Sequence, residues 1–246
     1  MKLTGSHTWP KQLPELTSEQ LAIRDDFMHF WHETLATKKS YVPVEKFNHG
    51  YSVRNAPAHF ERTLEIGGGL GEHLFFENLT DTQRRNYVSV ELRKSMVEQI
   101  RERFPDIVAH QGDCQGRLNF EDGFFDRILA IHVLEHLPNL PATVKEMYRL
   151  CNKEHGTFSI VIPCEGGMAY RFARFISAER IFKKRYRQPY KWLIESEHLS
   201  IPDEIIKEVS RYFEPIHQEY FPFMVPVIDI NLVIGMTFKP KPQGSF

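Results

Sequence analysis

Short apolar runs alternate with amphipathic stretches through the middle of the chain. Each run has the length and the β-rich composition of a buried strand. The runs are Leu64–Ile66, Tyr87–Leu92, Ile107–Gln111, Arg127–Ile131 and Gly156–Pro163. The last two are separated by a helical pattern over Leu140–Leu150. This alternation predicts an α/β fold with a mostly parallel, doubly wound sheet, because each crossover between parallel strands is right-handed.

The last third of the chain has a different order of elements. A helix is predicted over Ile201–Tyr212, with proline in its first turn. Two apolar runs, Pro215–Phe221 and Ile230–Lys239, then follow without a helix between them. Pro222 and Pro226 belong to their connection, since proline donates no ladder hydrogen bond. We therefore expect a hairpin whose final strand is antiparallel to its neighbours.

Three glycines at alternate positions follow the first apolar run. Gly67, Gly69 and Gly71 allow positive φ and bring the backbone close to a ligand at the start of a predicted helix. A dinucleotide fingerprint would place its third glycine at position 72, where this chain has Glu72. With Glu65 before the turn, the site is expected to be acidic at both ends. This disfavours an NAD-linked oxidoreductase and suits a positively charged ligand.

Two segments carry a resemblance to a known family. The stretch from Glu65 to Gly71 resembles motif I of the class I S-adenosylmethionine-dependent methyltransferases. The stretch from Phe124 to Leu137, with its His-Val-Leu-Glu-His sequence, resembles a second segment of methyltransferase type 11-like members. The resemblance covers roughly residues 62–163. It implies a seven-stranded, Rossmann-like sheet with an antiparallel last strand, and S-adenosylmethionine as the cofactor.

The remaining cofactor residues follow the next strands. Glu91, at the end of the second strand and followed by Leu92, can accept hydrogen bonds from both ribose hydroxyls. The resemblance implies that Asp113 and the backbone amide of Cys114 recognise adenine, and that His132 lies at the methionine side of the cofactor. With Glu65 and the three glycines, these residues form the expected cofactor site.

Methyl transfer to an alcohol would need a general base, and histidine suits neutral pH. The candidates are His132, His136 and His198, with Glu165 and Glu197 behind them. Other roles stay open for all three histidines. His132 can form a wall of the cofactor pocket, His136 can begin the next helix, and His198 can be a surface residue.

The chain outside the core is expected to have two parts. Residues 1–60 form an N-terminal segment with a helix capped at Thr17 or Ser18 and a stretch that is either a lid or ordinary packing, with Tyr51 and Arg54 as its key residues. Residues 61–246 form the methyltransferase domain, with an insertion at 165–199. The insertion is rich in Lys, Arg and aromatic residues. It is either a basic amphipathic helix for an anionic substrate or membrane surface, or a solvated helical face.

The composition limits the location, partners and cofactors that can be expected of the protein. The net charge is −1 and no apolar run approaches a membrane span, so a cytoplasmic protein without a nucleic-acid partner is expected. Three cysteines lack metal-site spacing, and no metal is expected. The expected acceptor is a small molecule, with a sugar or a lipid- or nucleotide-linked biosynthetic intermediate as candidates. A non-enzymatic S-adenosylmethionine-binding module stays open as the alternative.

Overall fold

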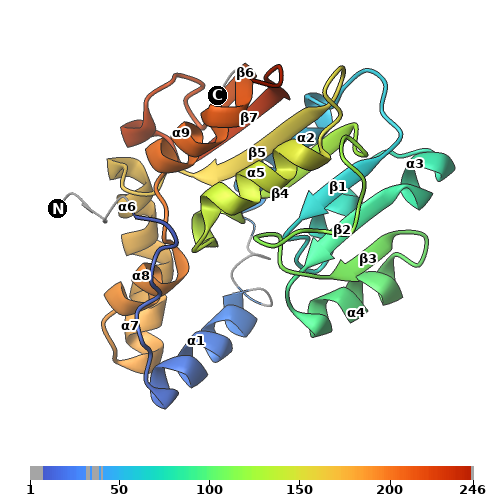
Figure 1. Cartoon of the computed structure of the whole chain (residues 1–246). Helices are drawn as coiled ribbons and strands as arrows, with labels where there is room; N and C mark the ends of the chain where they lie inside the picture. The colour runs from blue at the N-terminus through green and yellow to red at the C-terminus, as the bar shows by residue number, and fades with distance from the viewer. Residues whose placement is uncertain (1–7, 32–33, 35–38, 40, 245–246) are drawn as a thin grey trace.

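A seven-stranded sheet forms the centre of the protein in the computed structural model, which describes residues 8–31, 34, 39 and 41–244 (Figure 1). The strand order is β3-β2-β1-β4-β5-β7-β6. Strands β1 to β5 are parallel, and β7 is antiparallel to both of its neighbours. The strands are β1 (Thr63–Ile66), β2 (Tyr87–Glu91), β3 (Val108–Gln111), β4 (Arg127–Ile131), β5 (Thr157–Pro163), β6 (Phe213–Phe221) and β7 (Val233–Pro240). The predicted fold class and antiparallel last strand are thus confirmed.

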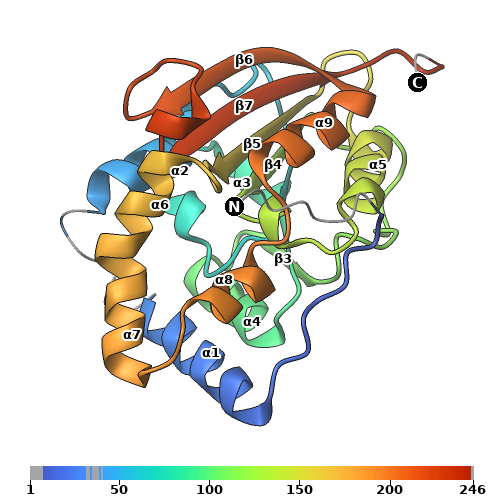
Figure 2. The same cartoon turned by 90° about the vertical axis from the view of Figure 1, so that its left-hand side faces the viewer.

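Helices cover both faces of this sheet and extend beyond one of its ends (Figures 1 and 2). The α-helices are α1 (Ser18–Phe30), α2 (Val42–Arg54), α3 (Asp81–Arg85), α4 (Lys94–Arg103), α5 (Leu140–Leu150), α6 (Met168–Arg174), α7 (Arg180–Tyr186), α8 (Lys191–Glu197) and α9 (Pro202–Tyr212). Shorter helical turns are η2 (Glu72–Phe75), η3 (Leu134–His136), η4 (Phe175–Glu179) and η5 (Ile228–Ile230).

The central strands are buried on both faces, which explains their continuous apolar sequence. Every residue of β1 and β2 is buried, as are six of the seven residues of β5. The amphipathic helices α5 and α9 pack their apolar faces on one side, and Val144, Ile205 and Val209 are fully buried there. The sheet therefore holds its carboxyl-terminal loops on a rigid core.

A buried ion cluster lies beneath the first loop of the sheet. Arg127 of β4 is fully buried, and its guanidinium contacts the Glu77 carboxylate at 2.7 Å and donates to the Ser52 carbonyl oxygen of α2. His73 contacts the same carboxylate at 2.7 Å. Burial alone would raise the pKa of Glu77, but the contacts with His73 and Arg127 lower it to about 2. The cluster fixes the chain that follows η2.

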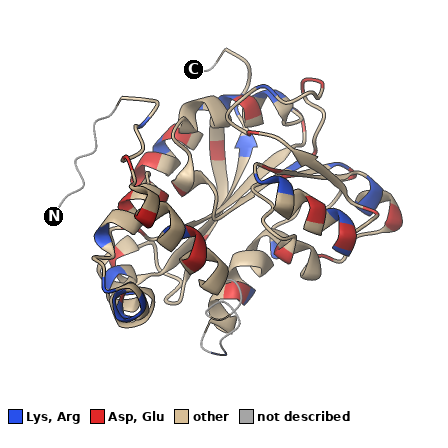
Figure 3. Ribbon diagram, turned by 90° about the horizontal axis from the view of Figure 1, so that it is seen from below, with Lys and Arg blue, Asp and Glu red and all other residues tan. Residues whose placement is uncertain are grey.

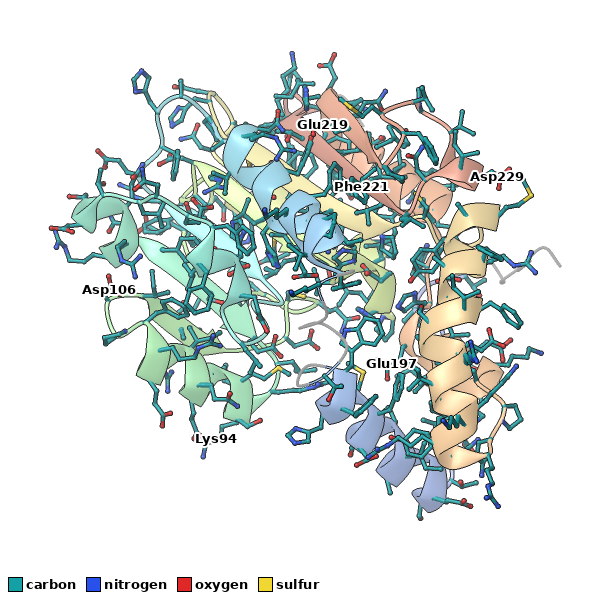
Figure 4. The ribbon with its side chains drawn as sticks, turned by 180° about the vertical axis from the view of Figure 1, so that it is seen from behind. Lys94, Asp106, Glu197, Glu219, Phe221 and Asp229 are labelled. Atoms are coloured by element: carbon teal, nitrogen blue, oxygen red, sulfur yellow. The ribbon has the colours of Figure 1, made fainter. Side chains whose placement is uncertain are left out.

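The segment predicted as a lid packs as a helix on the sheet instead. Tyr51 of α2 is fully buried, its ring lies against Gly235 of β7, and its hydroxyl is 3.1 Å from the Thr237 hydroxyl. Arg54 forms an ion pair with Glu219 of β6, labelled in Figure 4. The lid interpretation of Tyr51 and Arg54 is therefore wrong, because these side chains support the hairpin.

The N-terminal helix begins as predicted. The Thr17 side chain accepts from the Gln20 amide, and the Gln20 side chain accepts from the Thr17 amide, which completes a capping box. The apolar spacing of Leu21, Phe27, Met28 and Trp31 predicts that this helix includes Leu35, which lies outside the described residues. Helix α1 does not pack on the sheet, so its apolar face needs another partner.

That partner is the insertion. Helices α6, η4 and α7 follow one another without a break, and α8 turns back beside them. Phe27 of α1 contacts the ring of Phe182 of α7 edge-on, at 5.2 Å between centroids, and packs with Tyr190 and Leu193. Helix α1 and the insertion thus form a second cluster away from the sheet, lower left in Figure 1, which we call the helical lobe.

Candidate active site

The glycine loop connects β1 to η2 at the carboxyl edge of the sheet. Gly67, Gly69 and Gly71 have φ values of 66°, 56° and 79°, as their spacing predicted. A Cβ on Gly67 would lie 2.4 Å from a methyl group of Val133, and one on Gly71 would lie 2.7 Å from the Phe104 ring. A Cβ on Gly69 would approach only the Glu72 carboxylate. Two glycines are thus required by packing as well as by φ, and Gly69 leaves the loop accessible.

Glu65 lies behind this loop. Its carboxyl is buried and accepts a hydrogen bond from the Tyr87 hydroxyl at 3.0 Å. Burial raises the pKa of Glu65 to about 8, against the opposing effect of the Tyr87 hydrogen bond. Burial thus favours the neutral form of Glu65, whose carboxyl lies beneath the loop and supports it. This corrects the expectation of a site charged at both ends.

Glu72 stays at the mouth of the loop. Its carboxylate accepts from the Leu70 amide at 2.9 Å. The predicted α-helix after the glycines is instead the 3-10 turn η2, because His73 turns inward to the buried Glu77. The helix-start amides expected to face the ligand are thus partly bound by Glu72 itself.

Glu91 joins the glycine loop to the second strand. One oxygen of its carboxylate accepts from the Gly69 amide at 3.2 Å, and the other accepts from the Arg93 amide at 3.0 Å. A carboxylate has about four lone-pair directions, so each oxygen keeps one for a ribose hydroxyl. Leu92, next in sequence, is 62% exposed and offers an apolar surface at the same edge.

The adenine residues follow the third strand. The Gly112 amide donates to the Glu91 carbonyl oxygen at 3.0 Å, which brings the loop after β3 beside Glu91. The Asp113 side chain is exposed and accepts from the Gln115 amide at 2.9 Å. The Cys114 thiol is buried, and burial raises its pKa to about 12. The thiol is thus not available at this edge, and the role of the Cys114 amide stays a prediction.

His132 directly follows the last residue of β4. Its φ of 52° is strained for a residue with a side chain, and such strain is concentrated at functional sites. Nδ1 lies 3.2 Å from the Glu135 carboxylate. Nε2 is buried and has no hydrogen-bond partner among the residues that the structure describes. The ring is held at one nitrogen and available at the other.

Glu135 joins the three predicted histidines into one network. Its carboxylate lies 3.9 Å from Nε2 of His136, and the His136 ring contacts the His198 ring edge-on at 5.1 Å. Nδ1 of His198 lies 2.9 Å from the Glu165 carboxylate. The insertion thus brings His198 to the site from the far side, and the surface interpretation of His198 is wrong.

The electrostatics of the network favour an ionised Glu135. Its side chain is only 1% exposed, and burial alone would raise its pKa. The His132 hydrogen bond and the neighbouring His136 and His198 instead lower the pKa to about 2. Burial lowers the pKa of His136, although Glu135 opposes that shift. The result is a buried, ionised carboxylate that lies 3.2 Å from Nδ1 of His132.

A cavity of about 280 Å³ lies between this network and the helical lobe, and we call it the acceptor chamber. Its walls are mainly aromatic and aliphatic. They include Phe27, Trp31, Tyr41, Tyr170, Tyr190 and Leu193, together with His132, Glu135 and His136. Glu197, the last residue of α8 and labelled in Figure 4, also lines the chamber. The described residues of the chain hold no group of three or more His, Cys, Asp or Glu placed to bind a metal ion.

Sequence reasoning missed the aromatic walls as site residues. In the sequence, Phe27, Trp31 and Tyr190 belong to apolar or aromatic stretches that predict packing and do not point to a site. Burial raises the pKa of Tyr41 and Tyr170 well above the usual range, so both hydroxyls stay protonated. The only sequence signal was the density of aromatic residues in the two segments outside the core.

The comparisons with known proteins agree with this geometry. A family model described as "Methyltransferase domain" matches residues 64–160, from β1 into β5. The chain carries a methyltransferase domain. With the sheet order and the glycine loop, this match is consistent with a class I S-adenosylmethionine-dependent methyltransferase. No curated protein matches the chain.

Solved structures share the fold of this methyltransferase at low identity. The protein PH0226 from Pyrococcus horikoshii is 14% identical with a TM-score of 0.61, covering 87% of this chain and 99% of its own. NodS of Bradyrhizobium japonicum, an N-methyltransferase solved with S-adenosylhomocysteine, is 10% identical (TM-score 0.58, coverage 89% and 99%). The cyclase SpnF is 12% identical (TM-score 0.61, coverage 94% and 100%). At these identities the likeness shows the fold alone.

The residues at the edge of the sheet fit S-adenosylmethionine. Gly69 leaves the loop accessible. The Glu91 carboxylate, which accepts from the Gly69 amide, can still accept hydrogen bonds from a ligand. Strands β3, β2, β1 and β4 are neighbours, so Asp113, Glu91, the glycines and His132 follow one another along a single edge. This is the order of adenine, ribose and methionine in the predicted cofactor site.

The described helices include none long and apolar enough to cross a membrane.

Proposed function

We propose that this methyltransferase transfers the methyl group of S-adenosylmethionine to a small acceptor bound in the acceptor chamber. In this proposal Gly67, Gly69 and Gly71 hold the methionine side, Glu91 binds the ribose, and Asp113 binds adenine with the Cys114 amide. The observation that carries the proposal is His132, strained and held by an ionised buried Glu135 beside both the glycine loop and the chamber. When bound, the cofactor supplies a methyl group attached to its sulfonium sulfur, which is a good leaving group.

The chain's own residues then orient the acceptor and take its proton. His132 accepts the proton of an acceptor hydroxyl at Nε2, while the Glu135 carboxylate stabilises the imidazolium that forms. A positioned base of this kind contributes about 10² to 10⁴ in rate. The aromatic walls exclude water and fix the orientation of the acceptor, which supplies much of the remaining rate enhancement.

The shape of the chamber limits the acceptor. About 280 Å³ is at the small end of ligand pockets, so it takes one ring or one compact group and not a whole nucleotide-linked sugar. Its aromatic lining suits a sugar ring or the apolar part of a lipid-linked intermediate. We infer that α1 and residues 165–199, the helical lobe, select this acceptor, and that residues 61–163 bind the cofactor.

A label-transfer experiment tests the proposal. The protein is incubated with S-adenosylmethionine labelled in the methyl group and with a fractionated small-molecule extract. We expect label to enter one fraction, and His132→Asn to slow incorporation by about 10² to 10⁴. The matched control is His155→Asn at the opposite edge of the sheet, where the ring contacts Asp126.

Calorimetry of cofactor binding separates the alternatives. S-adenosylmethionine should bind the wild-type protein. Binding without label transfer to any fraction would support a non-enzymatic binding module and overturn the proposal. Binding of NAD in place of S-adenosylmethionine would support an oxidoreductase.

A further inference from the structure

One face of the helical lobe is apolar and exposed. Met168, Phe172, Phe175 and Ile176 recur at helical spacing along α6 and η4, and they are 65%, 65%, 58% and 53% exposed. A solvated helix has polar residues at such positions. Contiguous exposed apolar side chains of this size mark an interaction surface.

The connection between β6 and β7 extends this surface. Phe223 and Met224 are 62% and 81% exposed, and Val225 and Val227 are also exposed. The connection lies at the start of α6, because a Cβ on Gly167 would be 2.6 Å from the carbonyl oxygen of Ile228 in η5. Figure 4 shows Asp229 of η5 beside the first turn of α6. Two segments distant in sequence thus expose apolar side chains side by side.

Cations surround the same helix. From Met168 to Arg187 the chain has seven basic residues and one acid, Glu179. The seven are Arg171, Arg174, Arg180, Lys183, Lys184, Arg185 and Arg187. Figure 3 views this helix nearly end-on, and blue ribbon of Lys and Arg gathers there.

Four of these cations are available to a partner. Arg174, Lys183 and Arg185 form ion pairs with Glu165, Glu179 and Asp26. The other four are exposed and, within the part of the chain that the structure describes, have no acidic partner. These four are Arg171, Arg180, Lys184 and Arg187.

The opposite face of the helix lines the acceptor chamber. Tyr170, Ala173, Ser177 and Ala178 border the chamber. They alternate along the helix with the exposed residues Phe172, Phe175 and Ile176, so one helix separates the chamber from the apolar surface. A molecule partitioned at that surface is one helix diameter from the site of methyl transfer.

We propose that this face docks onto an anionic lipid bilayer. We call it the docking face: Met168, Phe172, Phe175, Ile176 and residues 223–227, with Arg171, Arg180, Lys184 and Arg187. Aromatic and aliphatic side chains enter the boundary between headgroups and acyl chains, and the cations contact anionic headgroups. The excess of positive charge, seven basic residues against one acid from Met168 to Arg187, favours an anionic surface, and the exposed aromatic side chains suit the boundary of a bilayer. The proposal does not depend on methyl transfer.

Co-sedimentation with vesicles tests the docking face on the full chain. The probes are phosphatidylcholine vesicles with and without phosphatidylglycerol. We expect binding to the anionic vesicles and weaker binding as salt rises, because salt screens the headgroup charge. Lys184→Gln should weaken partitioning about five-fold, since one cation near such a surface contributes about that factor. Lys94→Gln on the distant helix α4 is the matched control and should change nothing.

The apolar part of the docking face is tested by a double variant, Phe172→Ser with Phe175→Ser. This double variant should lose vesicle binding, because buried aromatic area anchors such a surface. Ile216→Ser on β6, 52% exposed and outside the face, is the control. Unchanged thermal unfolding and unchanged S-adenosylmethionine binding show that the variants fold and that the cofactor site is intact.

Three results would overturn the proposal. The first is equal binding of wild type to neutral and anionic vesicles, or no binding to either. The second is vesicle binding by the double serine variant that equals wild type. The third is a wild-type dimer by light scattering that the double serine variant dissociates, since the face would then belong to a second copy of the chain.

Discussion

Replacement of Glu91 by alanine should weaken S-adenosylmethionine binding by about 1 to 3 kcal/mol. Two effects contribute. The ribose hydroxyls lose a carboxylate acceptor, and the Gly69 amide, now 3.2 Å from that carboxylate, loses the contact that fixes the glycine loop. Hydrogen bonds to a charged group contribute about 1.5 to 3 kcal/mol each, and water partly replaces them in a site at the protein surface. The corresponding rise in Kd is roughly 5- to 150-fold.

Isothermal titration calorimetry with S-adenosylmethionine measures this directly. Glu91→Gln separates the two effects, because its amide oxygen still accepts one hydrogen bond and should restore part of the affinity. Glu98→Ala, an exposed acid on α4, is the control. An unchanged Kd for Glu91→Ala, with unchanged thermal unfolding, would refute the assignment of Glu91 to the ribose.

Two further predictions concern stability. Since the pKa of Glu77 in the folded protein is about 2, below its ordinary value of 4.5, its stabilisation is present above pH 4.5 and is lost as pH falls toward 2. Glu77→Gln should therefore cost about 3 kcal/mol in urea unfolding at pH 7 and progressively less in acid, and an equal cost at all pH values would contradict the ion pair with Arg127. Gly235→Ala should cost about 1 to 3 kcal/mol, because the new Cβ would lie 2.4 Å from the Tyr51 ring. Gly116→Ala, where the Cβ would meet only ordinary contacts, is the control, and equal melting of the two variants would disprove the packing argument.

Much of the sheet could be predicted from the sequence, because parallel strands that are buried on both faces consist of short apolar runs. Arg127–Ile131 and Leu140–Leu150 match β4 and α5 at both ends. The antiparallel β7 followed from two strands without an intervening helix. Local sequence determined these elements, so local patterns sufficed.

The pattern of apolar and polar positions did not predict the structure where buried residues do not recur at a simple period along the chain. Helix α2 buries Asn48 and Ser52 beside Phe47 and Tyr51, so its polar residues obscured the helix and suggested a lid. Glu65 appeared to be a charged ligand residue, because its position beneath the loop and its contact with Tyr87 depend on tertiary packing. Neither feature has a local sequence signal.

The acceptor side of the site was the hardest part to predict. The carbonyl oxygen of Glu135 accepts from the Leu199 amide at 2.7 Å, which holds the end of the insertion beside η3. The chamber walls come from α1 and the insertion, which meet through Phe27 and Phe182. Such contacts between distant segments cannot be read from spacing. They explain why the cofactor residues were recognised and the acceptor chamber was not.

A crystal structure of the protein soaked with S-adenosylhomocysteine tests the central claim most directly. The account predicts density along Gly67 to Gly71, with the ribose hydroxyls on Glu91 and the sulfur toward His132 and the chamber. Density for the nucleoside at any other place, with the glycine loop bare, would contradict it.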